Sequence, residues 1–541
     1  MTVTEDAPAA APASESTAPR PAPPGLAAVL GTGDHKVIGR IWLVTALVHL
    51  VLVGVVNVLV SAERIDVDTF DILGADWIVQ ADTFRYIGGL FLLLLPLTIA
   101  VATAVVPLQV GASTIAFPRA AAAAAWGYLL GGGLLVAAYA MKGGAGGSDR
   151  DGVVLFVVAF GLLLVSLVIA WICIVTTVLA LRTTGMGLRK APLFAWSALV
   201  AGGVWILTLP VLAGLAVISY LDARYGGFLD GSTTGTFDRI SWAFGTPTIY
   251  AAAIPVVGFV GSVVPVFAQT RHHLHRVAMG LIGALGVLSI GAWTVPNLGG
   301  GMPFLYEAPW VVVSIAALVP LLGLVGLWGA TVQRGKLVLG SPLLFGVAAL
   351  LLALLGVAAG AVQAIEPIET LADGDAATTL FGTSWSSGIT ALLFVAGITA
   401  AVGGVVFWAP KLLGTRLHEG GARLVALLLL VGGAVGGIAT LAAGLFGEPG
   451  RAELVAVDNL DTIKTLDLLQ TAGDALLGLA GLVLLLVLVR ALAGGSEEAE
   501  ADPWSGHTLE WATGSPPAVT SEAPVYDSRH AQGPSAQEVE S

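Results

Sequence analysis

The stretch Trp242–Gly258, WAFGTPTIYAAAIPVVG, lies near the middle of the chain and is apolar enough to enter a membrane. It carries two prolines, a Phe-Gly pair and a single tyrosine. Proline interrupts the hydrogen bonding of a helix, and hydrocarbon offers no partner for the backbone groups that are freed, so neighbouring helices must supply one. We therefore expect this segment in the middle of a helical bundle and not at its lipid-facing surface.

The whole chain has the composition of an integral membrane protein. Hydrophobic residues make up 56% of its 541 residues and charged residues 11%, whereas soluble domains carry about 25% charged residues. Apolar runs of roughly 20 residues, the length that crosses a bilayer as a helix, recur along the sequence. Twelve such runs lie at residues 41–61, 86–107, 120–141, 152–181, 192–217, 248–269, 276–298, 307–333, 341–366, 386–413, 422–446 and 466–493. The prediction is an all-α, polytopic membrane bundle of about 12 transmembrane helices.

The placement of charged residues predicts the orientation, because cytoplasmic connections carry an excess of Lys and Arg. With the N-terminus inside, the basic residues of the even-numbered connections are Arg119, Arg182, Arg189, Lys190, Arg271, Arg276, Arg334, Lys336, Lys411, Arg416 and Arg423. Two odd-numbered connections are acidic and hold Glu63, Asp66, Asp68, Asp71, Asp76, Glu366, Glu369, Asp373 and Asp375. We expect a multi-pass protein of the cytoplasmic (plasma) membrane with both termini in the cytoplasm. Its net charge of −12 does not favour a nucleic-acid partner.

Three regions are expected along the chain. Residues 1–30 are rich in Ala and Pro, lack the apolar core of a cleavable signal peptide, and are predicted to be a disordered cytoplasmic tail. Residues 31–494 form the twelve-helix membrane domain. Residues 495–541 form an acidic, Pro-rich cytoplasmic tail that we expect to be mostly unstructured.

Several stretches, in order along the chain, carry a family resemblance. They are GDHKVIGR at Gly33–Arg40, PLQVGASTIAFPR at Pro107–Arg119, the stretch quoted first, PLLFG at Pro342–Gly346, FWAPKLLG at Phe407–Gly414 and DPWSGHTLEWATGSPP at Asp502–Pro517. Together they resemble subunit I of the haem-copper oxidases, in particular the actinobacterial cytochrome c oxidase subunit I. The resemblance implies the twelve-helix fold of that subunit, in which histidines hold two haems and one copper ion.

The ligand positions that the resemblance implies hold other residues here. Counting back from Pro96 places Arg85 at the position of a histidine that binds the low-spin haem. Thr246 stands at the position of a copper-binding histidine, and Thr248 at that of a glutamate used in proton delivery. The family's cross-linking tyrosine is retained as Tyr250.

The later helices lack the family's histidines as well. Residues Thr294–Pro296 occupy the place of two consecutive copper-binding histidines. Counting back from Trp408 places Gly388 and Thr390 at the two haem-binding histidines of the tenth helix.

The family's proton paths and propionate contacts are also altered. Leu324 stands at the position of a proton-path lysine. Thr114 and Thr103 replace an aspartate and an asparagine of the other proton path. Arg451 matches one of the arginines that hold haem propionates.

Histidines are too few for the family's cofactors. The chain has eight, which are His35, His49, His272, His273, His275, His418, His507 and His530. Only His49 lies well inside a predicted helix, either as a ligand or as a hydrogen-bonding group between helices. Imidazole is the ligand that suits both haem iron and copper. We therefore predict no haem, no copper, no metal site and no catalytic residue.

The remaining polar residues allow two interpretations each. His272, His273 and His275 form either a metal site or an anchor at the membrane surface. Arg85 and Asp474 are costly in lipid unless paired, so each belongs to an ion pair between facing helices, reaches the membrane surface, or serves transport.

Two further positions are open in the same way. Thr246 and Thr248 either form a small hydrophilic pocket with Tyr250 or bond to backbone carbonyls and close the cavity. Cys173 lies inside a predicted helix, where an inert buried thiol is the ordinary role.

Three functions are compatible with the sequence. The first is a degenerate paralogue that has lost its redox centres and has a structural or regulatory role beside other oxidase subunits or assembly factors. The second is an active terminal oxidase, which passes electrons from cytochrome c to oxygen and pumps protons. The third is a channel or transporter that reuses the emptied core.

Overall fold

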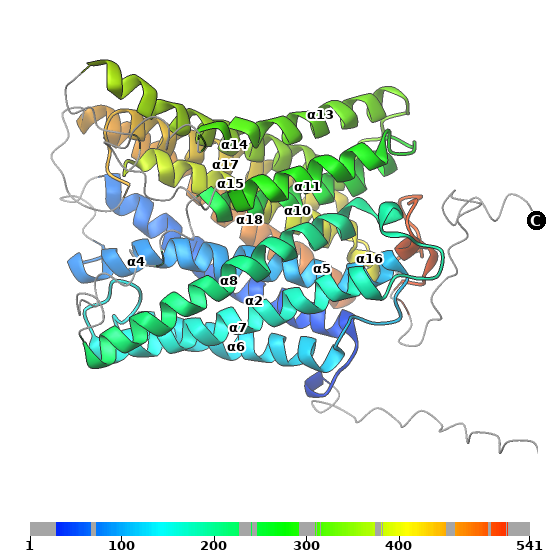
Figure 1. The fold of residues 1–541 in the computed structure, drawn as a ribbon, viewed down its shortest axis with the longest axis horizontal. Helices are drawn as coiled ribbons and strands as arrows, with labels where there is room; N and C mark the ends of the chain where they lie inside the picture. The colour runs from blue at the N-terminus through cyan, green and yellow to red at the C-terminus, as the bar shows by residue number, and fades with distance from the viewer. Residues whose placement is uncertain are drawn as a thin grey trace, which may run out of the picture.

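The computed structural model of the chain is a bundle of long helices that lie side by side with roughly aligned axes (Figure 1). It describes residues 29–65, 72–226, 240, 246–291, 309, 311–313, 315–373, 380, 382–450, 460–495, 499–515 and 517. Within those ranges, the side chains at 75–76, 246–251, 290–291 and 366–373 lie outside the description. The regular structure of the described residues is helical apart from one isolated bridge between Thr383 and Pro449.

The α-helices keep the order of the predicted apolar runs. They are α2 (His35–Ile65), α4 (Ala75–Ile87), α5 (Leu95–Val110), α6 (Pro118–Ala140), α7 (Arg150–Ala180), α8 (Leu193–Tyr225), α10 (Thr246–Phe267), α11 (His275–Gly291), α13 (Leu318–Gln333), α14 (Ser341–Asp373), α15 (Ser384–Phe407), α16 (Ala409–Leu413), α17 (Glu419–Leu445) and α18 (Leu460–Arg490). The π-helix η1 (Gly88–Leu94) joins α4 to α5, and the π-helix η5 (Ala491–Gly495) follows α18. Short 3₁₀ helices η2 (Leu188–Lys190) and η6 (Leu509–Ala512) lie in the connections.

The all-α membrane bundle is confirmed, and most of the predicted spans are confirmed with it. Among the described residues, 10 helices are long and apolar enough to cross a membrane. Two further apolar helices are shorter, at Ala252–Phe267 and His275–Ser289. The full count of twelve transmembrane helices therefore stays a prediction for α10 and α11.

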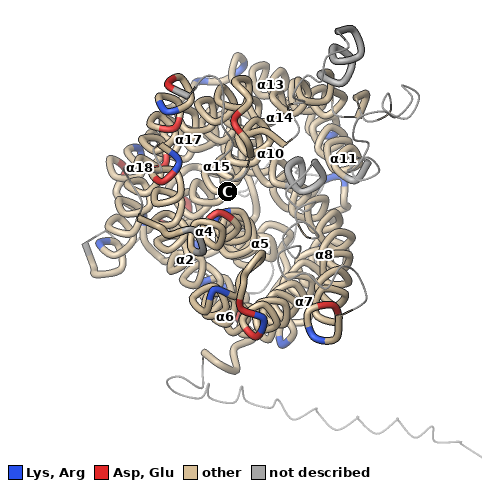
Figure 2. Tube along the Cα trace, turned by 90° about the vertical axis from the view of Figure 1, so that its left-hand side faces the viewer, with Lys and Arg blue, Asp and Glu red and all other residues tan. Residues whose placement is uncertain are grey.

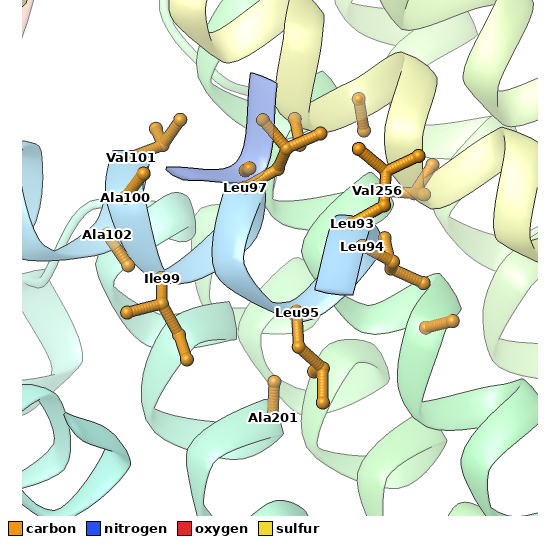
Figure 3. Close-up of a cluster of buried hydrophobic side chains, with 14 of the residues drawn as sticks. Leu93, Leu94, Leu95, Leu97, Ile99, Ala100, Val101, Ala102, Ala201 and Val256 are labelled. Atoms are coloured by element: carbon orange, nitrogen blue, oxygen red, sulfur yellow. The ribbon is translucent and has the colours of Figure 1, made fainter. Parts of the chain in front are cut away.

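The centre of the bundle is the second span, Trp77–Val110, formed by α4, η1 and α5. Its most apolar window has a mean hydropathy of 2.5 and is wholly buried, and its helices lie at the middle of the end-on view (Figure 2). Side chains from Leu93 to Ala102 point outward from it in all directions, toward Ala201 on α8 and Val256 on α10 (Figure 3). A helix with apolar side chains on every face is expected to be buried on every face, which agrees with the central place of this span.

The segment expected in the middle of the bundle is partly described. Its helical part Ala252–Gly258 is buried, as predicted, against α8 and α15. Residues 242–245 and the side chains of 246–251 lie outside the description.

Proline in the central span is accommodated by a neighbouring helix. Pro96 has no amide hydrogen, so a carbonyl one turn earlier loses its helical partner. The Leu92 carbonyl accepts a hydrogen bond from the Tyr128 hydroxyl of α6 at 3.1 Å instead. The π-helical turn η1 lies in the same place, where the Leu95 amide donates to the Leu90 carbonyl. The Leu92 carbonyl thereby has a partner within the protein, as hydrocarbon requires.

Glycine allows α17 and α18 to approach closely. A Cβ atom built on Gly473 would lie 2.5 Å from the Gly436 amide nitrogen and 2.8 Å from the Gly432 carbonyl oxygen. Membrane helices associate by packing of this kind, because lipid tails are as apolar as the side chains. No larger residue fits at Gly473 unless the two helices separate.

The expectation of a mostly unstructured C-terminal tail is wrong for residues 499–515. This stretch, the C-terminal strap, packs on the end of the bundle near α16, where it is drawn in orange to red (Figure 1). The Lys411 ammonium donates to the carbonyls of Ala501, Thr513 and Gly514 at 2.8, 2.5 and 3.2 Å. Although the composition of the strap is polar, its aromatic rings pack on apolar rings of the bundle.

A buried carboxylate fastens the strap to the bundle. Glu510 has no exposed surface and accepts hydrogen bonds from Gln109 Nε2 at 2.9 Å and Trp408 Nε1 at 3.2 Å. Trp511 is also buried, with the Lys411 ammonium 5.4 Å from its ring centroid. Trp504 donates to the Phe407 carbonyl at 3.0 Å.

Gly473→Ala should destabilise the protein by about 1–3 kcal/mol, the usual cost of overpacking a close contact. Gly203→Ala on α8 is the matched control, since a Cβ there meets nothing within 4 Å. The control should be neutral or stabilising by up to about 1 kcal/mol, because alanine favours helix over glycine. Unfolding free energies in lipid bicelles measure both, and equal effects would contradict the close packing of α17 on α18.

Glu510 should make stability depend on pH. Burial raises the pKa of its carboxyl above the ordinary 4.5, although the hydrogen bonds from Gln109 and Trp408 oppose the shift. The folded state then holds the proton more readily, so the stability linked to Glu510 is complete below pH 4.5 and is lost as the pH rises through the folded pKa.

Glu510→Gln keeps the Oε1 acceptor and cannot ionise. The melting temperature of this variant should therefore fall less between about pH 5 and about pH 8 than that of the wild type. Parallel curves for the two proteins would show that Glu510 does not titrate in this range.

Candidate functional site

The candidate site is a cavity of about 510 Å³ between α2 and α18, closed from behind by η1, α15 and α17. These helices lie next to one another in the end-on view (Figure 2). Most of the wall is apolar, and it includes Leu50, Val53, Leu93, Phe394, Ile398 and Leu429. We call this space the α2–α18 cavity. Its volume falls within the range of about 300–1,000 Å³ typical of small-molecule sites.

Polar side chains gather at one end of the cavity, which we call the polar end. They are Asn57, Arg85, Tyr86, Ser387, Gln470 and Asp474. The Arg85 guanidinium lies 2.9 Å from Asp82, one turn earlier on α4, and both side chains are almost fully buried. Arg85 also donates to the Tyr86 hydroxyl at 3.2 Å, and Tyr86 donates to Ser387 of α15 at 2.7 Å.

Arg85 and Asp474 lie in the same cavity, as an ion pair between facing helices would require. Asp474 on α18 is close enough to act electrostatically on the guanidinium. The direct contact of Arg85, however, is with Asp82 on its own helix. A charge in hydrocarbon needs such a partner, and here two carboxylates supply it.

Two of the counted haem positions meet at this cavity. Arg85 and Thr390 both line it, from α4 and α15. The Thr390 hydroxyl donates to the Ser386 carbonyl at 3.1 Å, one turn back, as threonine commonly does in membrane helices. The third position, Gly388, faces α17, where a Cβ would lie 2.8 Å from Leu441 Cγ and leave no room for an imidazole.

The residues around the cavity do not fit a haem held by two histidines. Among the described residues that line the cavity there is no His, Cys, Met or Lys. Tyrosine can ligate haem iron, but the Tyr86 hydroxyl already lies in hydrogen bonds with Arg85 and Ser387. The polar end therefore offers amides, hydroxyls and a neutralised arginine in place of a pair of imidazoles.

The histidine predicted inside a helix turns away from the cavity. His49 on α2 is 7% exposed and faces α6, with its ring centroid 6.3 Å from that of Tyr128. A Cβ on Gly132 would lie 3.4 Å from His49 Cε1. This placement supports a packing role for His49 between α2 and α6.

The copper half of the family's site lies largely outside the described residues. Residues 294–296 and Arg451 are not described, and neither are the side chains of Thr246, Thr248 and Tyr250. The two interpretations of those threonines therefore remain open.

The three proton-path positions are described, and they hold a leucine and two threonines. Leu324 and Thr103 are buried, in α13 and α5. The Thr114 hydroxyl donates to the Gly33 carbonyl at 3.3 Å.

The histidine cluster joins the α10–α11 connection to α13. His272 Nε2 accepts from Trp328 Nε1 at 3.1 Å, and burial lowers the pKa of His272 to about 4. The His273 amide donates to the Thr331 hydroxyl at 3.2 Å. Across the described part of the chain, no group of three or more His, Cys, Asp or Glu side chains is arranged to hold a metal ion.

Sequence reasoning missed Asp82 and Gln470. Asp82 was available to it, because a carboxylate three residues before an arginine lies on the same face of a helix. Gln470 has no such local signal, since only the packing of α18 against α2 brings it to the polar end.

Comparison with known proteins gives one consistent family. A family model described as cytochrome c and quinol oxidase polypeptide I matches residues 37–476. A putative cytochrome c oxidase subunit 1-beta of Streptomyces coelicolor is 28% identical, over 92% of this chain and 90% of that protein. Cytochrome c oxidase subunit 1 of Bacillus subtilis is 27% identical, over 90% of this chain and 79% of the other.

A solved structure shares the fold. A haem-copper terminal oxidase, determined by cryo-electron microscopy as a dimer, superposes with a TM-score of 0.64 over 84% of each chain. Its sequence is only 13% identical, so the likeness speaks for the fold alone.

Arg85→Ala should destabilise the protein by about 3–5 kcal/mol, because it leaves the buried carboxylate of Asp82 without its partner. Arg423→Ala is the matched control, since Arg423 pairs with Glu419 at 3.0 Å with side chains 51% and 30% exposed. Loss of that surface pair should cost less than about 1 kcal/mol. Unfolding free energies in bicelles measure both variants. A loss of stability at Arg85 as small as that of the control would contradict a stabilising ion pair between Arg85 and Asp82.

Proposed function

This chain belongs to the family of cytochrome c and quinol oxidase polypeptide I, and on that premise we propose that it is a non-catalytic member. In this proposal it keeps the subunit I fold, holds no redox centre, and has a structural or regulatory role in the respiratory chain. The observation that carries the proposal is the α2–α18 cavity, where Arg85 and Thr390 stand at counted haem positions and the described lining side chains include no imidazole.

The packing supports retention of the fold without a cofactor. Protein groups supply two polar contacts in the central span, namely the Tyr128 hydroxyl on the Leu92 carbonyl and the Arg85–Asp82 pair. The Gly-rich crossing of α17 and α18 needs no haem between the helices to hold them together. The bundle can therefore be stable as an apoprotein.

The setting follows from the family. Its relatives are named as subunit 1 of cytochrome c oxidase, which is a multi-subunit enzyme by that name. We place this chain in the cytoplasmic membrane with both termini in the cytoplasm, on the distribution of Lys and Arg. Other oxidase subunits or assembly factors are the partners that this role requires.

An active terminal oxidase is the main competing function. It would need axial ligands for the low-spin haem, which histidine supplies in the family, and the described lining residues offer none. A channel is supported less, because most of the described cavity wall is apolar.

The full-length protein, purified from a host that makes haem, should carry no haem. The pyridine haemochrome assay measures this, with subunit 1 of Bacillus subtilis, expressed and purified in parallel, as the positive control. His49→Ala should leave the spectrum unchanged, because that imidazole faces α6. A stoichiometric haem spectrum from the wild type would overturn the proposal.

A further inference from the structure

We propose that the α2–α18 cavity binds one chain of a neutral amphiphile whose head group is a hydroxyl, such as a monoacylglycerol. This inference rests on the proposed function, because a haem in the same space would exclude it. Four features of the cavity support it: the mouth, the unpaired polar atoms, the charge and the length.

The mouth of the cavity faces hydrocarbon. Four lining residues of the two helices that flank the cavity have large exposed surfaces, namely Val51 and Val55 of α2 and Leu479 and Leu482 of α18. All four are apolar and lie well inside the two spans. A molecule therefore enters from the bilayer, between α2 and α18.

Two buried polar atoms at the polar end have no hydrogen-bond partner. They are the donor Arg85 Nε and the acceptor Gln470 Oε1. Gln470 is 6% exposed, so its carbonyl is shielded from bulk water. Leaving such groups unpaired costs about 1–3 kcal/mol each. A hydroxyl group both accepts and donates hydrogen bonds, so a head group with two hydroxyls, as in a monoacylglycerol, carries the partners that both atoms lack.

The charge of the polar end disfavours an anionic head group. Arg85 is already opposed by two carboxylates, Asp82 at 2.9 Å and Asp474 nearby. A carboxylate or phosphate would add a third negative charge beside them. A cationic head group would have to compete with the Arg85 guanidinium for the same carboxylates.

The dimensions suit an acyl chain. The α2 residues that line the cavity run from Leu50 to Leu59, which corresponds to about 14 Å along a helix axis. Beside them, Ala391 of α15 is exposed although α15 is among the most buried spans. Its surface is open to the cavity, so the cavity passes deep enough to reach an inner helix.

The test uses the full-length protein in nanodiscs and a photoreactive monoacylglycerol with a diazirine in its acyl chain. Labelled peptides are identified by mass spectrometry. Labelling should fall on α2, α15 and α18 segments that line the cavity. Unlabelled monoacylglycerol should compete, and palmitate and palmitoylcholine should not.

Two variants and one control test the binding of the acyl chain and of the head group separately. Ala391→Leu fills the cavity and should reduce labelling at least tenfold, whereas Ala137→Leu, an exposed alanine on α6, should leave it unchanged. Gln470→Leu removes the acceptor and should weaken binding about fivefold, the equivalent of one hydrogen bond of about 1 kcal/mol. Thermal unfolding checks that each variant is folded.

The outcomes separate this inference from the proposed function. Labelling that Ala391→Leu does not change, or that palmitate or palmitoylcholine competes for equally well, overturns the inference. A haem-free protein without cavity labelling leaves the proposed function standing and refutes only the bound amphiphile. A haemochrome signal from the same preparation refutes both.

Discussion

The ion pair between Arg85 and Asp82 is the interaction on which the account of the site depends. Both side chains lie inside the central span of a bundle that crosses hydrocarbon, where an unpaired charge is strongly unfavourable. Asp474 approaches the same guanidinium from α18. Three charged groups from two helices thus lie near one another, and Arg85 and Asp474 line the adjoining cavity.

Two other features of the bundle also depend on contacts between helices. Pro96 leaves a carbonyl without its helical partner, and Tyr128 supplies the missing donor from another helix. Glycines allow α17 and α18 to touch through their backbones. The fold of the oxidase subunit is therefore held by contacts that do not involve a cofactor, which is why we propose that it persists without one.

The sequence predicted the bundle well and the site only in part. Composition and apolar runs indicated the spans, because a bilayer imposes length and hydropathy on every segment that crosses it. Counting from Pro96 and Trp408 placed Arg85 and Thr390 at related positions, and both line one cavity. Neither Gln470 nor the exposed surface of Ala391 was predictable, since both depend on how three helices pack. The ordered C-terminal strap was not predicted for another reason. Its composition is polar, and the burial of Glu510 and Trp511 depends on contacts with distant side chains such as Gln109 and Trp408.

The most direct measurement is an experimental density map of the purified full-length protein in nanodiscs, at a resolution that shows side chains. We expect the Arg85 guanidinium to lie on Asp82, and elongated, chain-like density to lie between α2 and α18. A flat macrocycle with axial density to a side chain of α4 or α15 would contradict it.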